Sequence, residues 1–319
     1  MSALKTQLEY ELKRFSAKSN SIETIFLGGG TPSTVAPELY KPIFELIEPY
    51  LSRNIEITSE ANPNSATKEW LLGMKKLGVN RISFGVQSFN ATKLKLLNRA
   101  HTPEMAICAI NNAAALGYEN ISLDLIYATL GDTKELLQKD IETAFSLPIN
   151  HLSAYALTIE EGTAFENKKE MSSEQLSLTK WIFKSLKSHG FEQYEISNFG
   201  KYQSAHNLGY WLYKDYIGAG AGAVGKLDQT RYYPTPDIEQ YIKNPLDIQT
   251  EELSAEDINI EQIFLGFRSS IGVKQTLLTQ EELKRVQILL EEKKLTLQND
   301  TLYNDDFLLA DEIALFLTS

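Results

Sequence analysis

The feature that most constrains the fold of this chain is a series of short apolar runs, each ending at a polar side chain or at glycine. In chain order these runs are 24–27 before Gly28–Pro32, 55–59 before Glu60, 81–86 before Gln87, 121–127 around Asp124, and a fifth run at 151–158. Stretches with helical spacing separate them, a rhythm that is typical of repeated βα units around a parallel sheet. In barrels of this kind the ligand lies at the carboxyl ends of the strands. The sequence therefore predicts an α/β fold whose polar groups meet at one mouth.

Residues that start and end helices give the boundaries of the elements between the strands. The predicted helices are 3–18, 37–51, 67–77, 90–97, 103–115, 133–146 and 172–188. Thr67 and Pro103 open two of them, and Gly78 and Gly117 end the same two. No strand is expected before the first helix, so we predict a partial (β/α)6 barrel that lacks its first strand and exposes a strand edge at 24–28.

The pattern changes after Gly190. Gln193–Ser197 predicts a sixth strand, whereas residues 199–236 are rich in Gly, Tyr and Asn and predict a compact loop. The last part of the chain predicts a small winged-helix-like domain, with helices at 256–268, 279–292 and 309–317 and a hairpin at 295–303. The predicted domains are the partial barrel at 1–198, a connecting region at 199–250 and a mainly helical domain at 251–319.

The composition narrows the classes of function. A net charge of −11 argues against a nucleic-acid binder held by phosphate contacts. We find neither an apolar run long enough to span a bilayer nor the apolar core of a signal peptide, so we expect a cytoplasmic protein. The single cysteine, Cys108, excludes an internal disulfide, and its apolar helical surroundings predict a buried packing residue.

The glycine run Gly28–Gly30, followed by Thr31 and Pro32, lies between a strand and a helix. Three glycines let backbone N–H and C=O groups approach a ligand closely, although a tight turn would also need them. The run matches neither a P-loop nor the G-x-G-x-x-G pattern of a dinucleotide site.

Four further side chains could bind a small ligand. The Glu60 carboxylate can bind a ribose diol or an ammonium group, or can cap the following helix. Gln87 is either a bidentate hydrogen bonder or a satisfied interior amide. Arg99 suits a carboxylate, or is a solvated surface residue. Asp124 interrupts an apolar strand and needs a partner or a ligand. Together these groups suit a zwitterionic ligand that carries a ribose.

A second group of residues is His206–Trp211, which reads His-Asn-Leu-Gly-Tyr-Trp. Imidazole is the usual axial ligand of haem iron and aromatic rings suit a porphyrin face, although core or turn packing is the alternative. We expect His101, His151 and His189 to be structural. No Ser/His/Asp triad can be assembled from the sequence.

Together these motifs resemble the radical S-adenosylmethionine (SAM) proteins of the oxygen-independent coproporphyrinogen III oxidase family, and more closely its haem-chaperone branch. The resemblance covers nearly the whole chain and is carried by Gly28–Pro32, Glu60–Pro63, Phe84–Phe89, Leu97–Thr102, Asp124–Tyr127, Tyr194–Phe199, His206–Trp211 and Asp215–Ala223. It implies a radical SAM barrel with SAM, a 4Fe–4S cluster and haem as cofactors or ligands.

The resemblance also implies roles for individual residues. The implied SAM-binding residues are Gly29, Gly30, Thr31, Glu60, Gln87, Arg99 and Asp124. His206 is the implied ligand of the haem iron. The implied function is that of a haem chaperone with a haem-accepting partner, including a membrane-associated acceptor among the candidates. The alternatives are an enzyme that oxidatively decarboxylates coproporphyrinogen III and a cluster-free pseudoenzyme that only binds partners.

The chain departs from the family pattern at two places. The family holds its cluster with a C-x-x-x-C-x-x-C segment after the first strand, and this sequence has no such segment. The simplest expectation is a shortened N-terminus, since the missing strand and the missing cysteines belong to the same piece. In addition, the family's Gly-Leu-Pro-Gly-Gln-Thr loop is replaced by Ala128–Thr133, which predicts a different loop shape.

Overall fold

The computed structural model forms two compact units. It describes residues 1–159, 165–173 and 176–319. The first unit, which we call the barrel unit, comprises Thr24–Lys41 and Ile55–Gln203. The second, the terminal unit, comprises Met1–Glu23, Pro42–Asn54 and Ser204–Ser319. Segments from both ends of the chain therefore share one unit, and the three-part division at 198 and 250 stays a prediction.

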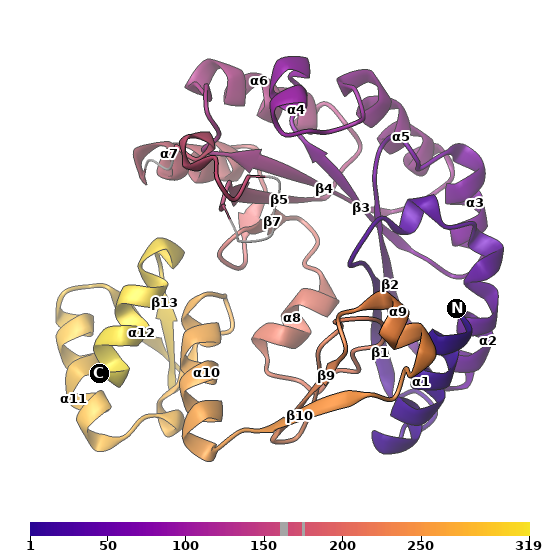
Figure 1. The fold of residues 1–319 in the computed structure, drawn as a ribbon. Helices are drawn as coiled ribbons and strands as arrows, with labels where there is room; N and C mark the ends of the chain where they lie inside the picture. Colours follow the sequence, from indigo (N-terminus) through magenta and orange to yellow (C-terminus); the bar gives the residue numbers. More distant parts are fainter. Residues whose placement is uncertain (160–164, 174–175) are drawn as a thin grey trace. The chain divides into compact units, whose positions relative to one another are not determined.

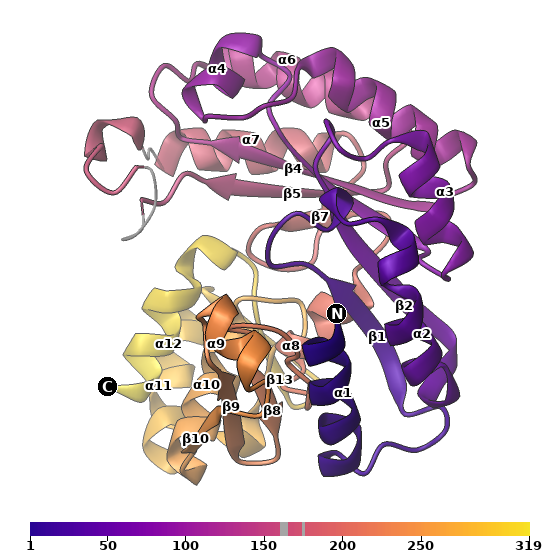
Figure 2. The same cartoon turned by 45° about the vertical axis from the view of Figure 1, so that its right-hand side comes forward.

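The barrel unit is built around a seven-stranded sheet with the order β1-β2-β3-β4-β5-β7-β6. Its strands are β1 (Ile22–Leu27), β2 (Leu51–Ala61), β3 (Arg81–Gln87), β4 (Asn120–Tyr127), β5 (His151–Ala156), β6 (Glu192–Gln193) and β7 (Asn198–Gly200). From β2 to β5 neighbouring strands are parallel. The sheet curls into a half-barrel, and helices α3 to α7 cover its outer face (Figure 2). The predicted α/β half-barrel is confirmed, and β1 lies at one edge of the sheet.

Three helices of the barrel unit begin after a threonine cap, and the predicted helix start at Thr67 is one of these caps. The helices of this unit are α3 (Lys68–Lys76), α4 (Ala91–Leu96), α5 (Pro103–Ala115), α6 (Lys134–Phe145) and α7 (Leu176–Ser188). The hydroxyls of Thr67, Thr102 and Thr133 each accept a backbone N–H in the first turn of the helix that follows. The start of the helix predicted at 172–188 includes residues 174–175, which lie outside the described residues.

The predicted sixth strand at Gln193–Ser197 is wrong. The chain turns between β6 and β7 instead, and β7 pairs antiparallel with both β5 and β6. The consecutive side chains of Tyr194 and Glu195 are both buried, with exposed fractions of 1% and 2%. Consecutive buried residues also occur in regular strands, as in the first four residues of β3, so the sequence pattern did not reveal this turn.

The prediction that Cys108 is buried is also wrong, because the residue is exposed. Helix α5 buries Ala106, Ala109, Ile110 and Ala113, which follow the helical period along one face. Cys108 lies on the other side of the helix. The apolar character of the stretch indicated the helix but not which way this residue faces.

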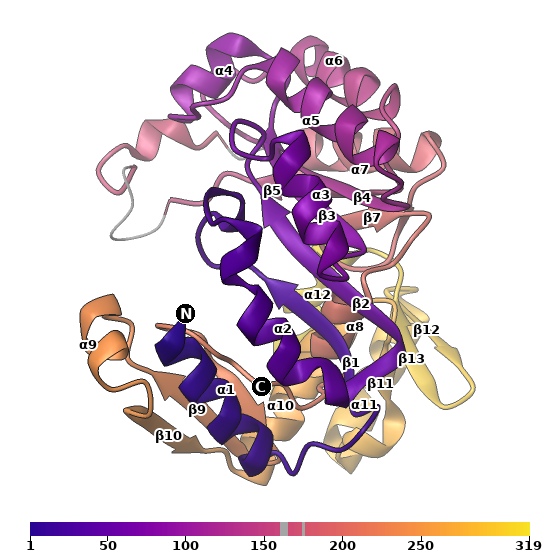
Figure 3. The same cartoon turned by 90° about the vertical axis from the view of Figure 1, so that its right-hand side faces the viewer.

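The terminal unit begins with α1 (Ser2–Arg14), which lies beside α9 and β9 (Figure 3). The other elements of its first half are α2 (Lys41–Ile47), α8 (Ala205–Trp211), β8 (Gly225–Leu227), β9 (Thr230–Pro234), α9 (Ile238–Lys243) and β10 (Ile248–Glu252). The fully buried Gln7 accepts hydrogen bonds from Gly220 N–H and Tyr241 O–H and donates one to Gly218 C=O. The loop predicted at 199–236 is thus partly regular structure, with a three-stranded sheet β10-β9-β8.

The end of the chain forms the predicted helical, winged-helix-like arrangement (Figure 1). Its elements are α10 (Ala255–Phe267), β11 (Val273–Lys274), α11 (Gln280–Glu291), β12 (Leu295–Gln298), β13 (Thr301–Asn304) and α12 (Ala310–Thr318). Ser254 and Thr279 form capping boxes with Asp257 and Glu282 at the starts of α10 and α11. Across the described residues of the whole chain, none of the helices has the length and apolar character needed to cross a membrane.

Candidate ligand-binding sites

The glycine turn after β1 is closed on one side and open on the other. The Gly29 N–H donates a hydrogen bond to the Glu60 carboxylate at the end of β2. A Cβ on Gly28 would clash with the Phe26 ring and lie 3.1 Å from the Glu60 carboxyl carbon. A Cβ on Gly29 or Gly30 would meet nothing within 4 Å, and Gly29 has a left-handed φ of +79°. Backbone groups of the turn therefore face open space beside a carboxylate.

Asp124 lies at the centre of this edge of the sheet. Its carboxylate accepts hydrogen bonds from the Ser83 hydroxyl on β3 and the Ser153 hydroxyl on β5. Burial raises the pKa of Asp124 to about 6, although these hydrogen bonds and the nearby charges of Arg81 and Arg99 oppose the rise. The β4–β5 register pairs Asp124 with Ser153 directly.

Glu60 shares the electrostatic environment of Asp124. Burial raises the pKa of Glu60, the Asp124 charge raises it further, and the hydrogen bond from Gly29 opposes both effects. In the sheet register Glu60 pairs with Ser83, which itself binds Asp124. The two carboxylates therefore come from alternate strands and face one region, an arrangement that favours a cationic ligand.

Gln87 ends β3 in an unusual backbone conformation. Its φ is +68°, and the β3–β4 pairing shifts between Phe84 and Gln87. A Cβ on Gly85 would lie 3.1 Å from the Gln87 amide nitrogen, so glycine leaves room for this side chain to fold back. A left-handed conformation at a residue other than glycine costs roughly 1 kcal/mol or more, so the surrounding contacts must hold Gln87 in it.

Arg99 follows α4 and keeps an exposed side chain. Partial burial lowers its pKa and the Asp124 charge raises it, so the guanidinium lies within electrostatic range of that carboxylate. Nearby, His101 is buried and its Nε2 bonds the Val86 carbonyl at 2.9 Å. Burial lowers the pKa of His101, which keeps the imidazole neutral near pH 7. Arg99 is thus the cation that this edge of the sheet presents to solvent.

Behind Asp124 lies a buried polar network that sequence reasoning missed. His151 Nδ1 lies 2.7 Å from Ser122 Oγ and 3.3 Å from an Arg81 guanidinium nitrogen, and its Nε2 lies 2.7 Å from Tyr194 Oη. Since Arg81 can only donate, Nδ1 accepts and Nε2 carries the proton. Burial keeps the pKa of His151 well below its usual range. These contacts join residues far apart in the chain, which a single sequence does not reveal.

The loop that departs from the family pattern is anchored by a buried ion pair. Lys93 Nζ lies 2.8 Å from Asp132 and also donates to the Ile126 carbonyl. Asp132 in turn accepts the N–H of Thr129, and Ala128 has a φ of +58°. The Asp at position 132 therefore fixes the path of the chain after β4.

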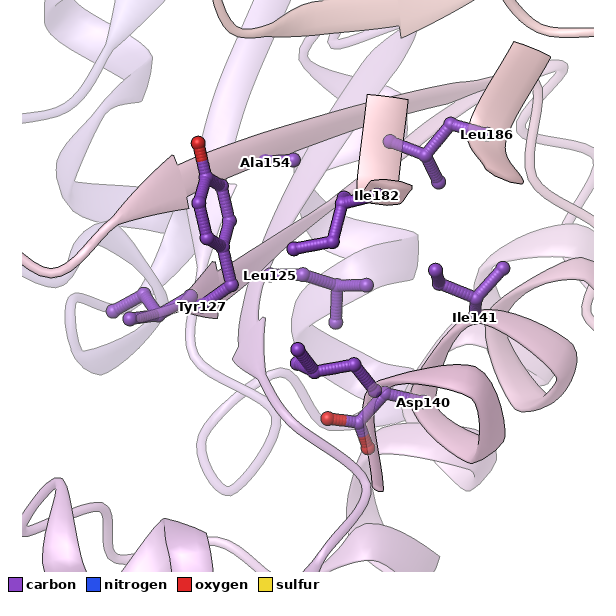
Figure 4. Close-up of a pocket in the computed structure, with 9 residues that line it drawn as sticks. Leu125, Tyr127, Asp140, Ile141, Ala154, Ile182 and Leu186 are labelled. Atoms are coloured by element: carbon purple, nitrogen blue, oxygen red, sulfur yellow. The ribbon is translucent and has the colours of Figure 1, made fainter. Parts of the chain in front are cut away.

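The gap enclosed by β4, β5, α6 and α7 is not a ligand site. It has a volume of about 10 Å³, enough for roughly one water molecule, and its walls are mainly apolar side chains such as Leu125, Ile141 and Leu186 (Figure 4). Void space of this size in an apolar core is a packing imperfection.

His206 lies in the terminal unit, on the short helix α8. Ser204 caps this helix by accepting the Asn207 N–H. The His206 Nε2 lies 3.1 Å from Tyr210 Oη one turn later, and the Tyr210 ring packs edge-on against Tyr216 with centroids 4.8 Å apart. The half-buried imidazole is therefore part of an aromatic group at the protein surface.

The chain does not hold the ligands that an iron–sulfur cluster needs. Cys108 is the single cysteine of the sequence. Among the residues that the structure describes, no three His, Cys, Asp or Glu side chains come together as a metal site. One thiolate cannot bind a 4Fe–4S cluster that needs three, so these residues do not fit the cluster.

Comparison with known proteins gives consistent results across the chain. The Radical SAM superfamily matches residues 3–144. The "Heme chaperone HemW" of Bacillus subtilis is 35% identical, over 84% of this chain and 76% of the relative. The protein of the same name from Lactococcus lactis is also 35% identical, over 81% of this chain and 72% of the relative. The expected resemblance is confirmed.

The structural comparison supports the fold. The coproporphyrinogen III oxidase of Escherichia coli, described as a radical SAM enzyme, superposes with a TM-score of 0.82 over 100% of this chain and 82% of that one. Its sequence identity is 17%, so this likeness shows a shared fold and does not by itself carry a shared activity.

Proposed function

Because this chain belongs to the family of the heme chaperone HemW, we propose that it binds haem and SAM and passes the haem to an acceptor protein. The observation that carries the proposal is sequence identity of 35% to proteins with this name, sustained over more than four fifths of the chain. Membership of the radical SAM family implies SAM and a 4Fe–4S cluster as cofactors.

The edge of the half-barrel suits SAM by charge. SAM carries an ammonium, a sulfonium and a carboxylate, and thus has one net positive charge at neutral pH. Glu60 and Asp124 supply two carboxylates for its cationic groups and its ribose, and Arg99 supplies a guanidinium for its carboxylate. The raised pKa values of both acids fit this assignment, because a bound cation would relieve the unfavourable burial of their charges.

The remaining predicted residues would shape the same site. The open space over Gly29 and Gly30 would admit the methionyl end of SAM against backbone N–H groups, with Thr31 at the outer end of the turn. Gln87 would offer its amide from the strained end of β3. Because the residues of this chain do not fit the cluster, the role that we propose for SAM is that of a bound ligand, without a chemical step.

His206 is the proposed ligand of haem iron. The proposal rests on the His-Asn-x-x-Tyr-Trp motif at 206–211 and on the position of the imidazole beside aromatic rings. Haem is cargo here, so one protein ligand and an open second face would suit its transfer to an acceptor. Experiment must identify the acceptor, and membrane-associated proteins are among the candidates.

The test is a haemin titration of the 319-residue protein, followed by the Soret band. We expect His206→Ala to weaken binding and to shift the Soret maximum, because the iron would lose its imidazole. His189→Ala is the matched control, since His189 is exposed and stacks on Phe145 in the barrel unit. Equal affinity and an unchanged spectrum in the His206 variant would remove the ligand assignment.

A further inference from the structure

The terminal unit contains a pocket of about 330 Å³ that the SAM site does not explain. It is bounded by α8, β8, β9 and α10, and α8 packs against α10 (Figure 1). Its aromatic walls come from Tyr210, Tyr213, Tyr216 and Phe264. A volume of this order is at the lower end of the range for small-molecule sites, and aromatic walls suit a flat ring system.

The charged residues of the pocket are mostly cations. Lys214, Lys226, Arg231 and Arg268 line it, against one carboxylate, Glu261. Both oxygens of that carboxylate are already bound. Tyr213 donates to one at 2.5 Å and Arg231 to the other at 2.6 Å. Each of the four cations also has a carboxylate partner, so an anionic ligand would bind here by joining or replacing an existing ion pair.

Two of the four cations belong to the pocket wall. The Lys226 side chain is 5% exposed, binds Asp215 at 2.7 Å, and lies 4.5 Å from the centre of the Tyr213 ring. Arg231 is held by Glu261. These contacts fix the shape of the pocket and leave little freedom to bind a ligand.

The other two cations are available. Lys214 is 51% exposed and pairs with Glu23, and Arg268 is 36% exposed and pairs with Asp311. Exposed ion pairs of this kind contribute little, so an incoming carboxylate can replace or join them at small cost. Lys214 Nζ makes one hydrogen bond, and Nη1 of Arg268 makes none with the part of the chain that the structure describes.

We propose that this pocket binds the porphyrin of haem, with its two propionate groups paired to Lys214 and Arg268. Tyr210 connects the pocket to the proposed iron ligand, because it lines the pocket and its hydroxyl lies 3.1 Å from His206 Nε2. The iron ligand would thus stand at the rim and the carboxylates would lie at the cationic side. This inference rests on the proposed function and adds contacts to the porphyrin that do not involve iron.

The experiment compares three ligands with four proteins. The ligands are haemin, haemin dimethyl ester, which lacks the propionate charges, and protoporphyrin IX, which lacks iron. The proteins are the wild type, Lys214→Gln, Arg268→Gln and the control Lys284→Gln. Lys284 has the same charge and an exposed ion pair with Glu281, but lies on α11 outside the pocket. Far-ultraviolet circular dichroism checks that each variant is folded.

We expect Lys214→Gln and Arg268→Gln each to lower the affinity for haemin and for protoporphyrin IX by about fivefold to tenfold. This is the size expected for one charge-assisted contact near the surface. The wild type should bind the ester weakly, and the two pocket variants should bind the ester with the same affinity as the wild type. Lys284→Gln should match the wild type with every ligand. These differences should shrink as salt is added.

The outcomes separate the two proposals. If haemin and its ester bind the wild type equally well, or if the two pocket variants match the Lys284 variant, the propionate assignment is overturned. The His206 assignment would still stand in that case, provided that His206→Ala lowers the affinity for haemin. If the wild type binds no haemin, the proposed function fails and the pocket assignment fails with it.

Discussion

The buried acid Glu195 gives the sharpest test of the barrel unit's electrostatics. Glu195 is 2% exposed. Its carboxylate accepts hydrogen bonds from the backbone N–H groups of Ser197 and Asn198 and from the Asn198 side chain. Burial outweighs these hydrogen bonds and raises the pKa of Glu195 to about 7, from an ordinary value of 4.5. The substitution Glu195→Gln keeps the size of the side chain and removes its ionisation.

The sign of the pH effect follows from where the proton is bound. Between pH 4.5 and about 7 the folded protein holds the proton of Glu195, whereas the unfolded chain has released it. The free energy of unfolding of the wild type therefore falls as pH rises through this window, and the loss is complete above it. A pKa difference from 4.5 to about 7 corresponds to about 3 kcal/mol.

We therefore expect the stability of Glu195→Gln relative to the wild type to increase by about 3 kcal/mol as pH rises from about 4.5 to about 8. Gln loses some hydrogen bonding, but that loss is nearly constant with pH and does not alter the difference between the two conditions. The pH dependence, rather than the stability at one pH, is thus the quantity to measure.

Urea unfolding followed by tryptophan fluorescence makes the measurement. In a Trp211→Phe background both remaining tryptophans, Trp70 and Trp181, lie in the barrel unit together with Glu195. Glu192→Gln, at an exposed position three residues earlier, controls for the loss of one carboxylate. A stability difference that stays flat with pH, or that narrows as pH rises, would refute the claim that burial dominates at Glu195.

Four further predictions concern the ligands and the cysteine. Asp124→Asn should weaken SAM binding by about tenfold to a hundredfold at about pH 8, as expected for a hydrogen bond to a charged group. Wild-type SAM affinity should fall as pH drops below about 6, since a proton then competes for Asp124, and calorimetry at two pH values checks both effects. Incubation of the 319-residue protein with iron and sulfide should yield no stoichiometric cluster by absorbance and iron analysis, because its single cysteine cannot supply three thiolates. The exposed Cys108 should react with a thiol reagent in the native protein, and Cys108→Ser should change stability by less than about 0.5 kcal/mol in urea unfolding.

Local signals explain why much of the fold could be predicted from the sequence. The run at 81–86 together with the Gln87 that ends it matches β3, and the helix predicted at 103–115 matches α5 residue for residue. Each has a strong boundary signal nearby, such as Thr102 before Pro103 at the start of α5. Parallel strands then bring their carboxyl ends to one edge, which is why Glu60 and Asp124 could be placed together.

What could not be predicted depends on contacts between distant residues. The turn at Tyr194 and Glu195 is stabilised by contacts with β5, including the hydrogen bond that His151 Nε2 donates to Tyr194 Oη. The region 204–252 holds strands of three to five residues, which are too short for a periodic pattern to emerge. The pocket cations Lys214 and Arg268 lie far apart in the sequence, and only the fold shows that they line the same cavity.

The two proposed sites present side chains of different charge to their proposed ligands. The barrel unit presents Glu60 and Asp124, whose mutual repulsion and burial would be relieved by the cationic groups of SAM. The pocket of the terminal unit presents Lys214 and Arg268 among aromatic rings, which match the carboxylates and flat ring of a porphyrin. Haem at the acidic edge would place its propionates near two carboxylates, and the sulfonium of SAM in the pocket would face cations. If both proposals hold, the side chains that meet the two ligands differ in sign, which would favour a porphyrin in the pocket and SAM at the acidic edge.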